Sequence, residues 1–347
     1  MNNVEVKDYQ EVIKYLRKSK RQKHLLLGNG FSMAYDASIF SYNALSDFID
    51  QTEDKLLKKL FSIINTRNFE SIMKQLDVFY ELAVEFSSDK EFAEDVIKAR
   101  ESLKTRLLDA ISTLHPEHVF KIPETKSQKC AAFLREYLGS DGHVFSTNYD
   151  LLLYWVLMQN QESLANFEDG FGRNLIEQEE FDPDYKPEYG ELEWGNNSDV
   201  QCVHYVHGAL HLFDSGIAIR KEVYDGDYLL DNIKSRIEKK EYPIFVTAGD
   251  GKQKLEHILH NQYLDFCYKK LSSISGSLIT FGFNFGAHDD HIIDAINKAA
   301  KQDIENKLWS IYIGVYSEND INHVKRIHKK FKCKVNFFDS KTVPLWE

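Results

Sequence analysis

The sequence predicts an α/β protein with a doubly wound, mostly parallel sheet and a large helical insertion. Two observations lead to this class: short apolar segments alternate with amphipathic helical segments, and residues 43–138 keep helical spacing almost throughout. Strands that alternate with helices pair in parallel. The strand-like segments lie at 25–27, 144–147, 200–206, 244–247, 278–281, 308–315 and 335–338.

The first half of the chain is mostly helical by pattern. Apolar residues recur at helical spacing between 7 and 18, at Tyr9, Val12, Ile13 and Leu16. This spacing predicts an amphipathic helix before the first strand. Gly139 is a good stop for the last helix of the 43–138 insertion. Because no linker or repeat interrupts the pattern, we expect one domain over 1–347.

The second half adds helices at 252–271, 288–300 and 319–331. Residues 214–216, with sequence DSG, separate two short apolar segments and predict a hairpin. Residues 159–199 have no clear period, which predicts a long loop, either a lid or a solvated acidic surface. The acidic side chains that favour the surface loop are Glu177, Glu179, Glu180, Asp182 and Asp184.

Composition limits the classes of partner. The 347 residues are 43% hydrophobic and carry a formal net charge of −11, which argues against a nucleic-acid or anionic-membrane surface. The longest apolar run, 151–158, is too short to span a bilayer, and the N-terminal residues have no secretory pattern. Four widely separated cysteines with no CxxC pair disfavour a zinc ribbon and fit a reducing cytoplasm.

Residues 25–32, with sequence LLLGNGFS, are the first candidate ligand site. A buried strand, a glycine loop and a helix start are the parts from which α/β proteins build phosphate sites. The dinucleotide fingerprint requires a third glycine, where this chain has Met33. The alternative is a tight turn that simply needs glycine.

Four polar loops follow predicted strands: GNGFS at 28–32, TNYD at 147–150, HG at 207–208 and GFNFG at 282–286, which leads to DDH at 289–291. Ligands of doubly wound sheets bind beyond the carboxyl ends of the strands. If these strands are parallel, the four loops meet at one edge of the sheet.

Each candidate residue also has a structural alternative. Asn148 can orient a ribose hydroxyl or a water, or form an Asx turn with the helix that Asp150 caps. His207 can act as a general base or be a satisfied core histidine. Phe31 can cover a nicotinamide ring or fill the core. Acids at the 289–291 helix start can simply cap it.

A metal site is the remaining alternative for the histidines. His204, His207 and His211 are close in sequence, but positions 204 and 207 face opposite sides of a strand, and Gly208 interrupts it. We therefore expect no metal.

The order GNGFS, TNYD, HG and GFNFG resembles a sirtuin-type NAD-consuming domain. Sirtuins have a GAGxS loop, an NxD motif, a catalytic HG and a late glycine-serine loop; here Asn29 replaces the usual alanine and Asn284 the usual serine. The segment 245–249, with Lys254 and Tyr263, is similar to an uncharacterised bacterial branch of sirtuin-like proteins. The resemblance implies a Rossmann-like fold, catalysis by Asn148, Asp150 and His207, and NAD contacts at Gly28, Asn29, Gly30, Phe31, Ser32, Gly282, Phe283, Asn284, Asp289 and His291.

The four-cysteine zinc module and the peptide-pairing strand of deacetylating sirtuins are missing from this sequence. The resemblance therefore implies an NAD+ hydrolase of the kind found in bacterial antiphage defence rather than a protein deacylase. An NAD or ADP-ribose sensor without catalysis, or a scaffold subunit in a defence complex with a nucleic-acid motor, remains the alternative. Because an unrestrained NAD hydrolase would poison its own cell, we expect a homo-oligomer or a complex with a partner ATPase.

Overall fold

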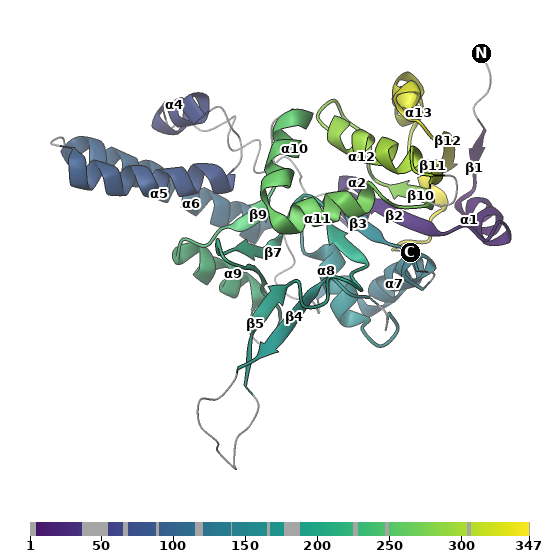
Figure 1. Ribbon diagram of the computed structural model, residues 1–347, viewed down its shortest axis with the longest axis horizontal. Helices are drawn as coiled ribbons and strands as arrows, with labels where there is room; N and C mark the ends of the chain where they lie inside the picture. The colour runs from purple at the N-terminus through teal and green to yellow at the C-terminus, as the bar shows by residue number, and fades with distance from the viewer. Residues whose placement is uncertain are drawn as a thin grey trace, which may run out of the picture.

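The computed structural model describes residues 5–36, 55–64, 69–87, 90–114, 121–139, 141–164, 167–176, 188–224, 228–246, 250–303 and 307–346. In this part of the chain, a seven-stranded parallel sheet and a five-stranded antiparallel sheet form the α/β body (Figure 1). The fold class predicted from the sequence is confirmed for the parallel sheet.

All pairs in the seven-stranded sheet are parallel. Its strands, in spatial order, are β1 (Val6–Lys7), β12 (Lys334–Asp339), β11 (Leu308–Val315), β10 (Gly276–Phe281), β2 (Lys23–Leu27), β3 (Val144–Ser146) and β6 (Val203–Tyr205). From β2 the chain adds β3 and β6 on one side, then β10, β11 and β12 on the other. This is the Rossmann strand order, and the direction reverses between β2 and β10.

Helices cover this sheet. They are α1 (Tyr9–Lys18), α2 (Asn29–Tyr35), α7 (Glu124–Leu138), α8 (Leu152–Gln159), α10 (Gly251–His260), α11 (Gln262–Leu271), α12 (Asp290–Ala300) and α13 (Glu318–Ile327). Helix α7 packs against β2 and β3, α11 against β6, and α12 and α13 against β11. Short 3₁₀ turns follow at His328–Lys330 and Ser340–Thr342.

The amino-terminal helix forms as the apolar spacing predicts. Tyr9, Val12, Ile13 and Leu16 are its buried residues, and Asp8 caps it in a reciprocal capping box with Glu11. Gly139 ends α7, also as predicted.

The second sheet was not predicted. Its strands, in spatial order, are β4 (Phe171–Leu175), β5 (Tyr189–Trp194), β8 (Ile219–Lys221), β7 (Gly208–Asp214) and β9 (Pro243–Phe245). The β7–β8 hairpin confirms the turn at 214–216. The expectation of a loop over 159–199 was wrong where β4 and β5 lie, while the acidic residues at 177–187 fall outside the described residues.

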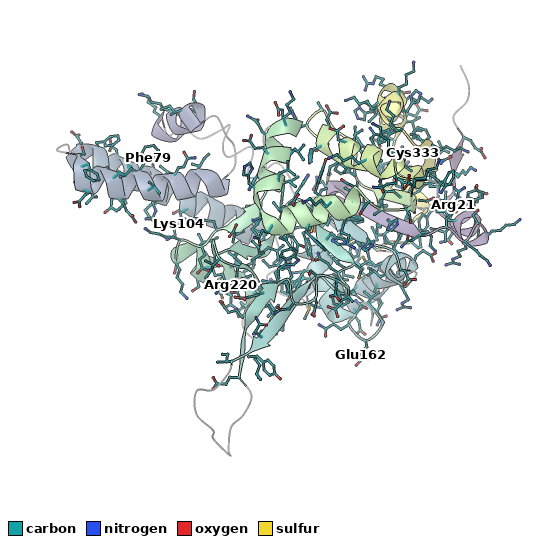
Figure 2. All side chains as sticks on the ribbon, in the orientation of Figure 1. Arg21, Phe79, Lys104, Glu162, Arg220 and Cys333 are labelled. Atoms are coloured by element: carbon teal, nitrogen blue, oxygen red, sulfur yellow. The ribbon has the colours of Figure 1, made fainter. Side chains whose placement is uncertain are left out.

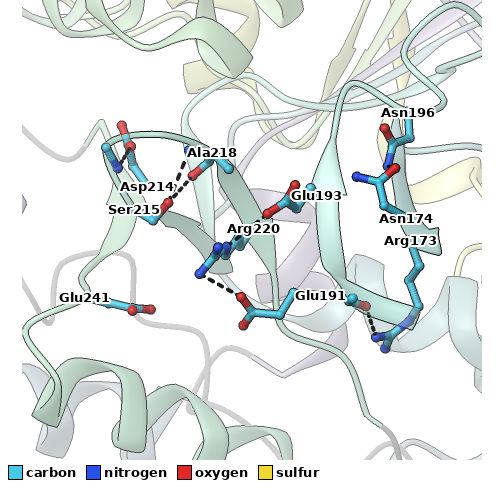
Figure 3. A network of polar contacts seen from close by, with 12 residues as sticks. Arg173, Asn174, Glu191, Glu193, Asn196, Asp214, Ser215, Ala218, Arg220 and Glu241 are labelled. Atoms are coloured by element: carbon cyan, nitrogen blue, oxygen red, sulfur yellow. Dashed lines mark hydrogen bonds and ion pairs between the residues drawn. The ribbon is translucent and has the colours of Figure 1, made fainter. Parts of the chain in front are cut away.

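Strands β4 and β5 could not be found by apolar periodicity because only one of their residues, Phe171, is buried. Their acidic side chains are partly neutralised (Figure 3). Arg220 on β8 pairs with Glu191 at 2.7 Å and with Glu193 at 3.3 Å, and Arg236 on α9 (Leu229–Glu238) pairs with Glu191 at 2.5 Å. These ion pairs join β5 to β8 and to α9.

Most of the described part of the predicted insertion is helical, as α4 (Lys55–Ile64), α5 (Phe69–Phe86), α6 (Lys90–Leu114) and α7. Helices α5 and α6 pack on each other and extend from the α/β body, with Phe79 half-exposed on α5 (Figure 2). Helix α7 instead lies on the sheet, so it belongs to the Rossmann-like frame. Residues 43–54, where the insertion was expected to begin, fall outside the described residues.

The single helix expected over 252–271 is two helices, α10 and α11, which meet at Asn261. Asn261 has extended backbone angles, and its side chain accepts a hydrogen bond from the Leu264 N–H at 3.1 Å. Asparagine favours such a cap over a helix interior, which explains the break.

Within the described residues, we find no helix that combines the length and hydropathy needed to cross a membrane. The four cysteines, Cys130, Cys202, Cys267 and Cys333, are free thiols.

Candidate functional site

The four polar loops lie at one edge of the parallel sheet. They follow β10, β2, β3 and β6, which are consecutive neighbours in the sheet and run in the same direction. The carboxyl ends of these strands therefore meet, as the sequence predicts. The reversal of strand order between β2 and β10 falls within this group, which is where ligands of doubly wound sheets bind.

The two glycine segments touch each other at this reversal point. The first is a loop only at Gly28, because α2 already begins at Asn29 and includes Gly30 and Ser32. The Gly30 N–H donates to the Gly282 carbonyl at 2.9 Å, and the Gly28 N–H donates to the Phe281 carbonyl at 3.0 Å. A Cβ atom at Gly28 or Gly30 would lie 2.6 Å from atoms of Gly282. Close approach of the two loops thus explains the glycines, and these two N–H groups already have partners inside the protein.

Asn148, Ser32 and Asp150 form a chain of hydrogen bonds across the β2 and β3 loops. The Asn148 Nδ2 group donates to the Ser32 Oγ at 2.9 Å and to the Gly28 carbonyl at 3.1 Å. The Ser32 Oγ in turn donates to the Asp150 carboxylate at 2.5 Å. The sequence predicted these three residues as site residues but not the link through Ser32.

Two further atoms of this hydrogen-bond chain have different surroundings: the second carboxylate oxygen of Asp150 and the Oδ1 atom of Asn148. Asp150 also accepts from the N–H of Leu152, the first residue of α8, at 3.0 Å. The prediction that Asp150 occupies the cap position was wrong, because Leu151 is the N-cap residue of α8. Burial raises the pKa of Asp150 to about 6. The Asn148 Oδ1 atom is buried and has no hydrogen-bond partner among the described residues. This oxygen is therefore able to accept a hydrogen bond from a ligand.

The loop with His207 is fixed by the antiparallel sheet. The Val246 N–H donates to the His207 carbonyl at 2.9 Å, and the Tyr149 hydroxyl donates to the Val246 carbonyl at 2.5 Å. Gly208 has φ +79°, and a Cβ atom there would lie 1.9 Å from the Ile244 carbonyl oxygen. The glycine after His207 is thus required by the packing of β7 on β9.

His207 and His291 form a buried pair. Their Nε2 atoms are 2.8 Å apart, and their rings are 5.0 Å apart between centroids. The side chains are 2% and 1% exposed. Burial, followed by the charge of Lys254, lowers the pKa of His291 to about 3. Burial, His291 and Lys254 hold the pKa of His207 well below its usual range, while the Thr147 main chain acts weakly in the opposite direction. Both rings are therefore neutral at pH 7.

Lys254 is a buried cation next to this pair. Its Nζ atom lies 3.2 Å from the Asp289 carboxylate, whose other oxygen accepts from the Gly286 N–H at 3.0 Å. Sequence motifs alone did not indicate Lys254, which was named only as part of the resemblance to sirtuin-like proteins. One signal could have found it: Lys254 and Ile258, four residues apart, share the buried side of α10.

The other predicted ligand contacts are buried in the core or make separate contacts. The Phe31 ring packs on Trp346, with 5.3 Å between centroids, and is fully buried, so it fills the core. Phe283 is also buried, with its ring 4.8 Å from that of Phe285. Asn284 is exposed, and the Asn29 amide contacts the Met33 sulfur at 3.2 Å.

The three histidines of the metal alternative do not gather. His204 bonds to His143, with 3.0 Å between their ring nitrogens, whereas His211 packs on the Tyr154 ring. In the described ranges of the chain, no group of three or more His, Cys, Asp or Glu side chains is arranged to hold a metal ion.

The site is closed in this structure. The Asn148 side chain is only 5% exposed, and Ser32 is fully buried, as is the His207–His291 pair. A dinucleotide can reach these groups only if part of the surrounding chain moves.

No curated protein matches this chain. Among protein families, the one described as a domain of unknown function, DUF4917, matches residues 25–346, which run from β2 to the carboxyl end and include all four loops. The chain therefore belongs to the DUF4917 family.

Proposed function

We propose that this protein is an NAD+ hydrolase that releases nicotinamide and ADP-ribose. The observation that supports it most is the meeting of the Asn148 and His207 loops with two glycine loops at the point where the strand order reverses. In the reaction, a water oxygen bonds to C1′ of the ribose, and the bond to nicotinamide breaks with its electrons on the nicotinamide nitrogen. The water gives up one proton.

Asn148 is the residue that orients the ribose or the attacking water. Its Nδ2 group is held by Ser32 and Gly28, which leaves the partnerless Oδ1 atom as an acceptor in a fixed position. A neutral amide does this without adding charge to the site. Positioning of this kind contributes much of the rate enhancement when the leaving group is already good.

His207 is the proton acceptor. Because the ring is neutral at pH 7, it has a lone pair available for the proton that the water loses. Asp150, ionised above its pKa of about 6, supplies negative charge that stabilises the positive charge developing on the ribose.

The test is nicotinamide release by purified protein, followed by chromatography. We expect Asn148→Ala and His207→Ala to lose activity by about 10²–10⁴-fold, the usual contribution of an acid–base group. His260→Ala, a histidine on the exposed side of α10, is the matched control and should keep wild-type activity. Normal turnover by both site variants, with folding verified by circular dichroism, would contradict the assignment.

One observation favours a second candidate function, an NAD or ADP-ribose sensor without catalysis. The side chains of Asn148, His207 and His291 are almost fully buried, which suits a protein that holds a ligand more than one that releases product repeatedly. Calorimetric binding of NAD, with intact NAD recovered after hours, would support the sensor and exclude the hydrolase.

We also propose that the hydrolase acts in antiphage defence, under control of self-assembly or of a partner ATPase. The support is the resemblance of the four motifs to bacterial sirtuin-like effectors. Incubation with NAD of the protein alone, and then with the products of neighbouring genes, tests whether a partner switches activity on.

A further inference from the structure

We propose that His291 is a positioning residue for His207: through its Nε2 atom it fixes the tautomer and the orientation of the His207 ring, so that Nδ1 is the atom that takes the proton. This inference rests on the proposed hydrolase function. His291 was expected to contact NAD, and the geometry gives it a different role.

The first step concerns the hydrogen between the two rings. Two Nε2 atoms 2.8 Å apart are joined by one hydrogen, because two N–H groups would clash and two lone pairs would repel. The tautomer of one ring therefore dictates that of the other. With its Nε2 atom occupied in this way, His207 has only Nδ1 left for chemistry.

The second step selects the productive arrangement. A base at Nδ1 needs its lone pair there, so the hydrogen of His207 must be on Nε2 and must be donated to His291. His291 then carries its own hydrogen on Nδ1. The Nδ1 atoms of both rings are buried and have no hydrogen-bond partner among the described residues. The Nδ1 atom of His207 is therefore not committed to the protein and is the atom left to take the proton.

The third step is that His291 is rigidly placed. It lies in the first turn of α12, it is 1% exposed, and its carbonyl accepts from the Tyr268 hydroxyl at 3.2 Å. The ring of His207 is further limited by Tyr149, whose ring lies 6.4 Å away between centroids and nearly parallel. A fixed partner on one side and a stacked ring on another leave His207 few orientations.

Charged groups surround the His207–His291 pair on α10 and at the start of α12. Lys254 and His257 face it from α10, and both act against a positive charge on His207. Asp290, next to His291, acts in favour of one on that ring, and Asp289 is paired with Lys254. Loss of His291 therefore changes the hydrogen-bond partner of His207 while these charges stay in place.

The kinetic test compares His291→Ala with His291→Gln. Glutamine has an Oε1 atom that can accept from the His207 Nε2–H, so we expect it to keep activity within about tenfold of wild type. Alanine should lower kcat by about 10²-fold with KM nearly unchanged and should shift the acidic limb of the pH profile. His204→Ala is the control: His204 is a buried histidine on β6, the strand before His207, and the variant should keep kcat. Equal losses in the alanine and glutamine variants would overturn the proposal.

A spectroscopic test is independent of activity. In protein with ¹⁵N-labelled histidine, we expect His207 as the Nε2–H tautomer in the wild type and as a tautomer mixture in His291→Ala. An Nδ1–H tautomer in the wild type, or an unchanged His207 signal in the variant, would overturn the proposal. If the wild-type protein leaves NAD intact but shows these signals, the hydrolase proposal fails while the pairing stands.

Discussion

At the scale of single residues, the glycines of the site show that a motif typical of ligand binding can be required by packing alone. The sequence identifies Gly28, Gly30 and Gly282 as glycines near a ligand, and the structure places them at the reversal point. Their missing side chains, however, make room for the opposite loop. A sequence cannot separate these causes, because close approach of a ligand and close approach of a distant backbone both require glycine.

This explanation predicts a specific effect on stability for Gly282→Ala. Gly282 has φ +67°, and a Cβ atom there would lie 2.5 Å from the backbone of Gly30 and Phe31. Gly216 is the matched control, since it has φ +84° with nothing within 4 Å of its Cβ position. We expect Gly216→Ala to cost about 1 kcal/mol in unfolding free energy and Gly282→Ala about 3 kcal/mol or more. Urea unfolding measures both, and equal losses would show that the loops do not constrain Gly282.

At the scale of elements, six of the seven strands of the parallel sheet and the helices beside them could be predicted because most of them are buried and regular, whereas the two-residue, partly exposed β1 was not predicted. The strand at 308–315 and the helix at 7–18 are examples. Strands β4 and β5 could not be predicted, because exposed strands take their stability from pairing and ion pairs rather than from an apolar pattern. The sequence likewise predicted that the four polar loops meet at one edge of the sheet. It did not predict the contact of His207 with His291, which depends on how α12 packs.

Three neighbouring elements carry a second set of histidines, away from the candidate site. His24 on β2, His143 before β3 and His204 on β6 are linked: the His143 N–H donates to His24, and His143 and His204 bond at 3.0 Å. Burial lowers the pKa of His24 to about 3 and that of His143 to about 4, and holds that of His204 well below its usual range, with Lys270 acting on the last two in the same direction.

Because these histidines are buried and neutral, we predict that the unfolding free energy of the protein decreases in acid. Their folded-state pKa values lie below the unfolded value of about 6.5, so between pH 6.5 and about 4 the unfolded chain binds more protons than the folded one. The unfolding free energy should therefore be retained above pH 6.5 and fall as the pH drops through this window. The buried His207–His291 pair adds to the effect. Urea unfolding at a series of pH values measures the slope.

A variant isolates one member of this set. His204→Gln removes one buried titrating ring, so we expect the slope to decrease by up to about 1.4 kcal/mol per pH unit, the value for one proton. His260→Gln, on an exposed histidine, is the matched control and should leave the slope unchanged. A His204→Gln slope equal to that of wild type would mean that His204 is not neutral in the folded protein.

At the scale of the whole molecule, the burial of the site has to be reconciled with the NAD+ hydrolase activity that we propose. His207 is 2% exposed and Asn148 is 5% exposed. A dinucleotide therefore cannot contact these two side chains in the conformation described here. A change in how the surrounding elements pack is required, and association with a second copy or a partner is a means of stabilising such a change.

We therefore predict that nicotinamide release per protomer increases with protein concentration as the chain assembles. Light scattering gives the molar mass, and nicotinamide release is measured on the same samples over a dilution series. His207→Ala should assemble as the wild type does while releasing no nicotinamide, which separates assembly from chemistry. Constant specific activity from a dilute monomer would contradict control by assembly. In that case access to His207 and Asn148 must come from motions within a single chain, since a site this buried cannot turn over without one.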